Sequence, residues 1–267
     1  MGGLEPYEVY AIKYADHQRL ASENFIGGDP HNGPMPLDYF VWAIKGMHRT
    51  WIVDTGFDAD VAMQRQRNLI RSPVDGLRAL EIDPDSIEDV IITHMHYDHC
   101  GNHHLFAGAR FHVQDKEMFY ATGRCMCQLV LRHAFDVESV VTMVRRTYGG
   151  RVTFHDGDEE LAPGISVHHV GGHTMGLQMV RIWTKRGWVV LASDASHLYA
   201  NMEQERPFPI VYNVADMLAG HRKAYALASS RHHVVPGHDP LVLKRYPAPS
   251  RALEGIVSRL DVDPAEQ

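Results

Sequence analysis

Hydrophobic residues along this chain fall into short runs that predict β-strands, separated by stretches with helical character. Most runs are rich in β-branched and aromatic residues, and several are closed by glycine, proline or aspartate, as strands usually are. The predicted strands cover residues 7–14, 39–44, 51–53, 90–92, 110–113, 152–154, 165–170, 177–183, 188–192 and 233–235. Because helical stretches follow strands in both halves of the chain, the pattern predicts an α/β fold.

The helical stretches show start signals or a helical hydrophobic period. Ser72 is suited to cap a helix, with Pro73 in its first turn and an acidic residue three positions after the cap. A second helix is predicted at about 214–228, where apolar residues recur on one stripe. Residues 116–148 lack strand alternation and are rich in helix formers. No linker separates two compositions, so we expect one domain over residues 1–267 with a helical insertion at about 116–148.

Composition excludes some classes of partner. Of the 267 residues, 45% are hydrophobic, which is enough for a real core. The formal net charge is −7 and the lysines and arginines form no block, which argues against nucleic acid and anionic membrane as partners. No segment approaches the roughly 18 apolar residues that span a bilayer, and the N-terminus lacks a signal-peptide pattern. Three cysteines without a disulfide-like spacing fit structural thiols, so we expect a cytoplasmic protein that binds small molecules.

The stretch IITHMHYDHCGN, residues 91–102, places four side chains that bind protons or metals directly after an apolar strand. His94, His96 and Asp98 lie at offsets of two, so an extended segment projects them from one face. His99 joins them if the chain turns, which the following glycine and asparagine favour. The spacing differs from the zinc motif HExxH, whose histidines need a helix.

Three later strands end in the same way. They lead into GGHT with His173, SDAS with Asp194 and PGH with His238. In α/β sheets, ligands usually bind in the crevice beyond the strand ends. One tetrahedral zinc takes about four ligands, so seven candidates suit two metal ions that share a carboxylate. The histidines that we interpret as surface residues are His103, His104, His168, His169, His232 and His233.

At these residues the sequence resembles the metallo-β-lactamase superfamily, whose THxHxDH hallmark stands at 93–99. GGHT, SDA, PGH and the IVDTG at 52–56 match further motifs, and the likeness runs from about Tyr39 to His238. The resemblance implies an αββα sandwich and two divalent metal ions, with Zn2+ the expected metal and iron, manganese or cobalt as alternatives. The implied ligands are His94, His96 and His173 for one ion, Asp98, His99 and His238 for the other, and Asp194 as the bridge.

Within that superfamily the chain is most similar to the N-acylhomoserine lactonase-like enzymes, which include 4-pyridoxolactonase. Asp194 stands where true β-lactamases have Cys or Ser, and His96 stands where flavodiiron proteins usually have Glu. Glyoxalase II shares the seven ligands, but its first motif comes early and a helical domain follows its last ligand. Here 93 residues precede His94 and only 29 follow His238. The resemblance therefore implies a lactonase acting on an N-acylhomoserine lactone or a related small cyclic ester, in quorum quenching or in catabolism.

The expected reaction is ring opening by a metal-bridging hydroxide. Two adjacent cations lower the pKa of a shared water, which then supplies the nucleophile without a protein base. Asp98 is the candidate proton shuttle to the leaving oxygen. Many acylhomoserine lactonases carry a tyrosine three residues after the bridging aspartate, where this chain has His197, with Tyr199 two positions later. We take His197 and Tyr199 as candidate catalytic residues, with a surface position as the alternative for His197.

The helical insertion carries an apolar stripe that includes Phe119 and Phe135. Such a stripe is more often core or a homodimer interface than a pocket wall, and the alternative is that it lines the site together with the loop at 26–36. The arginines considered as partners of a substrate carboxylate are Arg124, Arg132 and Arg206, with ordinary surface positions as the alternative. Two further functions stay open, namely a thioesterase or amide-ring hydrolase and a metal-binding protein without hydrolytic activity.

Overall fold

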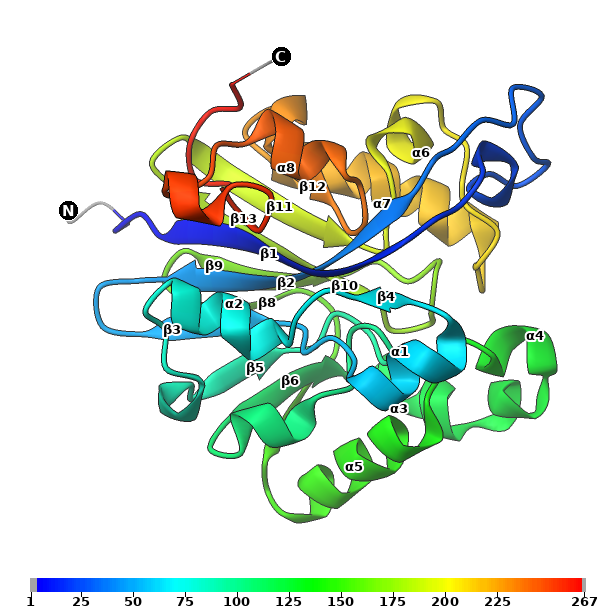
Figure 1. Cartoon of the computed structure of the whole chain (residues 1–267). Coiled ribbons are helices and arrows are strands. Elements are labelled where there is room, and N and C mark those ends of the chain that lie inside the picture. The colour runs from blue at the N-terminus through cyan, green and yellow to red at the C-terminus, as the bar shows by residue number, and fades with distance from the viewer. Residues whose placement is uncertain (1–3, 266–267) are drawn as a thin grey trace.

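The computed structural model describes residues 4–265, and two β-sheets form its centre (Figure 1). The eight-stranded sheet consists, in spatial order, of β13 (Val257–Arg259), β1 (Glu8–His17), β2 (Leu37–Lys45), β3 (Thr50–Val53), β5 (Asp89–Ile91), β6 (Arg110–Gln114) and β7 (Val152–His155), with β4 (Asn68–Leu69) paired to β1. The five-stranded sheet consists of β12 (Val234–Pro236), β11 (Gly187–Ser193), β10 (Gln178–Thr184), β9 (Ile165–His169) and β8 (Glu159–Ala162).

Helices form the two outer layers, and Figure 1 shows one group below the strands and the other above them. The lower group comprises α1 (Ala59–Arg65), α2 (Pro73–Ala79), α3 (Asp115–Thr122), α4 (Leu129–Arg132) and α5 (Val137–Tyr148). The upper group comprises α6 (Tyr199–Glu203), α7 (Val214–Leu227) and α8 (Leu241–Arg245). Short 3-10 helices are η1 (Ala21–Glu23), η2 (Pro84–Ser86), η3 (His103–Phe106), η4 (Arg124–Cys127), η5 (Arg231–His233) and η6 (Arg251–Leu253). The predicted αββα arrangement is confirmed.

Strand β2 shows why the central strands are apolar at nearly every position. Phe40, Trp42 and Ile44 belong to the core cluster that contains side chains of the five-stranded sheet. Tyr39 and Val41 belong to the other core cluster, which contains side chains of the lower group of helices. Successive side chains of a strand point to opposite faces, so a strand covered on both faces needs no polar alternation. Each of these side chains stabilises the fold by about 1.5–3 kcal/mol through burial.

Parallel pairing brings the ends of several strands to one edge. Strands β3, β5, β6 and β7 pair in parallel, and so do β11 and β12 in the other sheet. The segments that leave β5, β11 and β12 carry six of the seven candidate metal ligands, and the loop between β9 and β10 carries the seventh, His173. The topology therefore collects these segments where ligands of α/β folds usually bind.

Three strands of the structure were not indicated by the hydrophobic pattern: β4, β8 and β13. Strand β8 begins with Glu159 and Glu160, both exposed, and it lies at the edge of its sheet with β9 as its neighbour. An edge strand keeps one side in solvent, so charged residues are tolerated and even protective there. The other two strands have only two or three residues, too few to show a period.

Residues 115–148 form a series of short helices rather than one long helix. Helix α5 begins where the Asp136 side chain accepts a hydrogen bond of 2.8 Å from the Ser139 backbone N–H. Phe119, Leu129 and Val130 remain 62%, 70% and 75% exposed. A homodimer through this insertion and the single-domain organisation both stay predictions. Within residues 4–265, no helix has the length and apolar character needed to cross a membrane.

Candidate metal centre

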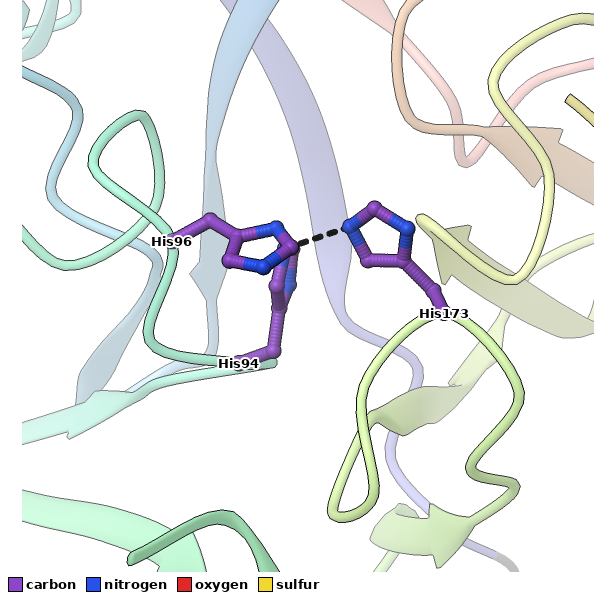
Figure 2. A group of neighbouring side chains, drawn as sticks. All are labelled: His94, His96 and His173. Atoms are coloured by element: carbon purple, nitrogen blue, oxygen red, sulfur yellow. Dashed lines mark hydrogen bonds between the residues drawn. The ribbon is translucent and has the colours of Figure 1, made fainter. Parts of the chain in front are cut away.

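The segment after β5 brings His94 and His96 to the edge of the sheet, and the loop after β9 brings His173 against them. Figure 2 shows the three rings facing one another from these two segments. The Nε2 atom of His94 lies 3.1 Å from Nδ1 of His96 and 3.1 Å from Nε2 of His173. The three rings are buried, and their ligand atoms lie within 4.8 Å of one another. The arrangement suits one metal ion with three nitrogen ligands.

A second group lies beside the first and contains Asp98, His99 and His238, whose ligand atoms also lie within 4.8 Å of one another. The Oδ2 atom of Asp98 is 3.6 Å from Nε2 of His99 and 3.7 Å from Nε2 of His238. These residues come from two segments more than a hundred positions apart, one after β5 and one after β12. The group offers a mixed nitrogen and oxygen environment for a second ion.

The carboxylate of Asp194 lies between the two groups. Its Oδ2 is 3.2 Å from Nε2 of His173 and 3.8 Å from Nε2 of His94, while its Oδ1 is 3.0 Å from Nε2 of His238 and 3.4 Å from Nε2 of His99. One oxygen thus faces each group. This is the position that a carboxylate shared by two metal ions requires.

The rings are held by the nitrogen that does not face the centre. His99 Nδ1 donates to Asp54 Oδ2 at 2.7 Å, His173 Nδ1 donates to the Ile210 carbonyl at 2.6 Å, and His238 Nδ1 donates to the Asp38 carbonyl at 2.9 Å. Such contacts fix the tautomer and turn the lone pair of Nε2 inward.

Burial and charge set the protonation of the centre. Burial lowers the pKa of His94 and of His96 well below the usual value, which leaves neutral rings with free lone pairs. Burial favours a lower pKa for His99 too, but the carboxylates of Asp194 and Asp98 outweigh it and raise the pKa well above its usual value. Burial favours a raised pKa for Asp194, yet the surrounding histidines hold it well below the usual range. The carboxylate is therefore anionic and ready to pair with a cation.

Among residues 4–265, two buried ligand atoms of the centre have no hydrogen-bond partner, namely His99 Nε2 and Asp194 Oδ1. In addition, the ring nitrogens of His94 and His173 face each other at 3.1 Å. Opposed lone pairs and orphaned buried acceptors cost free energy unless a proton or a cation lies between them. The donor set therefore fits divalent metal ions of the zinc type.

The backbone is strained where it delivers Asp194. Ser193 has a φ of 45°, a left-handed conformation that a residue with a Cβ rarely adopts and that costs about 1–3 kcal/mol. Gly237 lies opposite, and a Cβ there would come within 2.7 Å of Asp194 Oδ1 and 2.8 Å of the Ser193 carbonyl carbon. The glycine of the PGH motif is thus needed for the close approach of the two strand ends.

Glu117 is a buried residue of the site that the sequence did not single out. It belongs to α3, and its Oε1 accepts from the Met95 backbone N–H at 2.8 Å. Its Oε2 accepts from Thr174 Oγ1 at 2.6 Å and from the Gly176 backbone N–H at 3.0 Å. One carboxylate therefore joins the loop of His94 and His96 to the loop of His173. A lone glutamate in a helical stretch gives no signal for this role.

The structure separates the two candidate catalytic residues that follow Asp194. His197 lines the same cavity as the metal centre, its Nε2 lies 2.9 Å from Asp194 Oδ2, and its ring stacks on Phe208. It is 3% exposed, so the alternative of a surface histidine is wrong. Tyr199 instead begins α6 and lines a different cavity, with Arg245 above its ring. The structure therefore does not bring Tyr199 together with His197 at the cavity of the metal centre.

The cavity beside the metal centre has a volume of about 220 Å³. The arginines that line it are Arg19, Arg65 and Arg67. None of the three arginines that the sequence analysis considered is among them: Arg206 pairs with Asp29 at 3.1 Å, and Arg124 and Arg132 lie elsewhere in the insertion. Phe135 packs against the His96 ring at 4.6 Å, so the insertion does contribute to the wall around the site.

Comparison with known proteins agrees with this geometry. Residues 35–242 match the family model described as the metallo-beta-lactamase superfamily. The N-acyl homoserine lactonase AiiA of Bacillus thuringiensis subsp. kurstaki is 30% identical over 135 residues, which cover 49% of this chain and 48% of that protein. The N-acyl homoserine lactonase AiiB of Rhizobium rhizogenes is 28% identical over 174 residues, covering 61% and 60%. The chain spans about half the length of the Bacillus relatives that it matches.

Solved structures show the same fold. A quorum-quenching N-acyl homoserine lactone lactonase superposes with a TM-score of 0.73 at 21% identity, covering 89% of this chain and 95% of that one. AidC, described as a dizinc quorum-quenching lactonase, superposes with a TM-score of 0.68 at 14% identity, covering 90% of each chain. The resemblance found in the motifs is confirmed, and the fold is the sandwich of that family. The chain belongs to the metallo-β-lactamase superfamily.

Proposed function

We propose that this protein is a dinuclear metal-dependent lactonase that opens a small cyclic ester. The observation that carries the proposal is the position of Asp194, whose two oxygens face two separate groups of ligand atoms. The lactonase relatives support the choice of an ester ring as the substrate, since they are similar to this chain in sequence and fold. The seven residues that we propose as ligands are His94, His96, Asp98, His99, His173, Asp194 and His238.

His94, His96 and His173 would hold one ion, and Asp98, His99 and His238 the other, with Asp194 shared. Two divalent ions, for which we favour zinc, supply Lewis acidity and an activated water when they are bound. The protein contributes a closed and preorganised surround, because the ligand residues are at most 8% exposed. Low exposure keeps bulk water away and strengthens electrostatic stabilisation of charge that develops on the ester carbonyl.

Asp98 is the proposed proton carrier to the leaving alkoxide. It lines the cavity, and its side chain is the most exposed of the proposed ligands at 10%. Within residues 4–265 its carboxylate accepts no hydrogen bond, while its backbone carbonyl is held by the Tyr14 hydroxyl at 2.9 Å. One carboxylate oxygen can therefore face an ion while the other reaches the substrate.

His197 is the proposed contact to the substrate, since it lines the cavity next to Asp194. Burial lowers the pKa of His197 to about 3, so the ring is neutral at physiological pH. Stacking on Phe208 holds the ring at an interplanar angle of 10°. A neutral and immobile imidazole can donate or accept one hydrogen bond in a fixed direction.

A substrate panel tests the proposal. Metal-loaded protein is assayed with γ-butyrolactone, N-hexanoyl-homoserine lactone, S-lactoylglutathione and a chromogenic β-lactam, with Asp98→Asn as the matched control for contaminating activity. We expect hydrolysis of at least one lactone and its loss in the variant. Turnover of the thioester alone would instead establish the glyoxalase II-type alternative.

A further inference from the structure

Three guanidinium groups line the cavity beside the proposed metal centre, from Arg19, Arg65 and Arg67. In the described part of the chain, none of them forms an ion pair with a carboxylate, whereas Arg206 pairs with Asp29. Unpaired arginines around a partly enclosed cavity are costly, because burial removes water from each charge and like charges repel. Their presence needs either a structural role or an anionic ligand.

Arg65 has a structural role. Its Nη1 donates to the His133 carbonyl and its Nη2 to the Phe135 carbonyl, both at 2.8 Å, and its guanidinium lies 4.0 Å from the centre of the Tyr97 ring. These contacts tie the end of α1 to the insertion that forms the cavity wall. Both terminal nitrogens are therefore already engaged with the protein.

Arg67 and Arg19 keep donors free. Arg67 Nε donates to the Tyr97 hydroxyl at 2.9 Å, and its Nη1 donates to the Arg65 carbonyl at 2.6 Å and lies 3.2 Å from Nε2 of His17. Its Nη2 makes no hydrogen bond to the described residues. Arg19 donates from Nη2 to the Glu23 carbonyl, and its Nη1 makes no hydrogen bond to residues 4–265. Two guanidinium groups in the lining of one cavity thus keep unused N–H groups.

The surrounding charges increase the demand for an anion. Burial lowers the pKa of His17 to about 4, with Arg67 and Arg19 adding to the effect, so this ring is neutral and supplies no counter-charge to the arginines. Glu23 also lines the cavity, but its Oε2 is engaged by the Leu20 backbone N–H at 2.7 Å. Two divalent ions at the proposed centre would exceed the charge of Asp98 and Asp194. With these ions bound, the cavity as a whole would be positive.

We infer that the substrate carries a carboxylate, which Arg19 and Arg67 bind while the ester ring lies at the metal centre. The inference rests on the proposed lactonase function. One free terminal nitrogen from each arginine can serve one oxygen of a carboxylate, and such charge-assisted bonds are about twice as strong as neutral ones. The volume of about 220 Å³ is below the roughly 300–1,000 Å³ of most small-molecule sites. A compact lactone acid therefore fits better than a lactone with a long apolar chain.

The test compares two lactones that differ only by the charged group. Protein loaded with zinc is assayed with γ-butyrolactone and with γ-butyrolactone-γ-carboxylate, and the readout is the ratio of the two kcat/KM values. We expect the wild-type ratio to favour the carboxylate form, and Arg67→Met to reduce it by about 10- to 100-fold, as expected for the loss of a hydrogen bond to a charged group. Arg67→Lys should retain part of the preference, and Arg19→Met should act in the same direction.

Arg124→Met is the matched control, because Arg124 is exposed and does not line the cavity. This variant should keep the wild-type ratio. Preference for the neutral lactone in the wild type, or a ratio unchanged by both Arg67→Met and Arg19→Met, would overturn the inference while leaving the lactonase proposal intact. If no lactone is hydrolysed, the lactonase proposal fails. Calorimetric binding of 2-hydroxyglutarate, the ring-opened acid, then still decides whether the arginines hold a carboxylate.

Discussion

Two clusters of buried histidines lie at opposite ends of strand β5, and they differ in how their ring nitrogens are satisfied. At the start of the strand, Asp89 Oδ1 lies 2.8 Å from His112 Nε2, whose Nδ1 lies 3.0 Å from His155 Nε2. His155 Nδ1 in turn lies 2.7 Å from Glu159 Oε2, and Arg49 pairs with Asp89. Every ring nitrogen of this cluster has a protein partner. Past the end of the strand, the metal centre leaves His99 Nε2 without one.

The difference separates histidines that hold the fold from histidines that hold a ligand. The His112 cluster is a closed chain of hydrogen bonds between strands β5, β6 and β7, with a carboxylate at each end. The metal centre has more ring nitrogens than the surrounding protein can satisfy, and they converge on one carboxylate. The histidines are buried in both places, so it is the unmet bonding capacity that points to metal ions.

The largest expected effect is that of Asp194→Ala, which removes the carboxylate shared by both ligand groups. We expect loss of at least one metal equivalent and a decrease in kcat/KM of about 10³-fold or more, since Lewis-acid stabilisation is worth several kcal/mol. Elemental analysis and lactone hydrolysis measure the two effects. A fully loaded and active variant would show that Asp194 is not the bridge.

Asp98→Asn is expected to separate metal binding from chemistry. The amide keeps an oxygen for the ion but cannot carry the proton, so kcat should fall by about 10²- to 10⁴-fold with a smaller change in metal content. The measurement is kcat at saturating substrate on protein of known metal content. If metal content and activity fell in proportion, Asp98 would act only as a metal ligand and not as the proton carrier.

Glu117→Gln is expected to weaken the centre indirectly. The Glu117 carboxylate accepts hydrogen bonds from the Met95 N–H and the Thr174 hydroxyl. A glutamine side chain would place an N–H group against one of these donors, so the loops of His96 and His173 lose their common anchor. Metal affinity should fall by about 10- to 100-fold, as for other residues that orient ligands. Competition with a chelator measures it. Glu138→Gln, on the exposed side of the first turn of α5, is the control and should leave affinity unchanged.

His155→Phe should have the smallest effect on function and a clear effect on stability. Removing this ring leaves His112 and Glu159 without their partner, which costs about 1–3 kcal/mol in the free energy of unfolding when the group left unpaired is buried. Denaturant unfolding measures the loss. Metal content and kcat/KM should match the wild type, and a loss of metal would remove the distinction between the two clusters.

The local pattern predicts an α/β fold and the edge where the candidate ligands gather, whereas the αββα layers were implied by the resemblance to the family. His94, Asp194 and His238 each follow an apolar strand. A residue that directly follows a parallel strand lies at the carboxyl edge of the sheet, so its place can be read from the sequence. Glu117 and Arg67 were not predicted, because their roles depend on contacts between segments distant in the chain. Spacing alone also did not show that Tyr199 lines a different cavity from His197.

Burial of isolated histidines was the other feature beyond the reach of the sequence. His103 and His168 were interpreted as surface residues, but they are 2% and 8% exposed. His103 Nε2 donates to the Cys100 carbonyl at 2.9 Å, and His168 Nδ1 donates to Asp158 Oδ2 at 2.9 Å. His104 and His232 are exposed as expected. Whether a histidine finds a buried acceptor depends on tertiary packing, which residue type and spacing do not encode.

Metal stoichiometry set against activity tests the central claim most directly. The purified protein is stripped with a chelator, reloaded in steps with zinc, and assayed at each step by elemental analysis and by lactone hydrolysis. The paired centre around Asp194 predicts that activity reaches its maximum at two equivalents per chain. Full activity at one equivalent or fewer would contradict it.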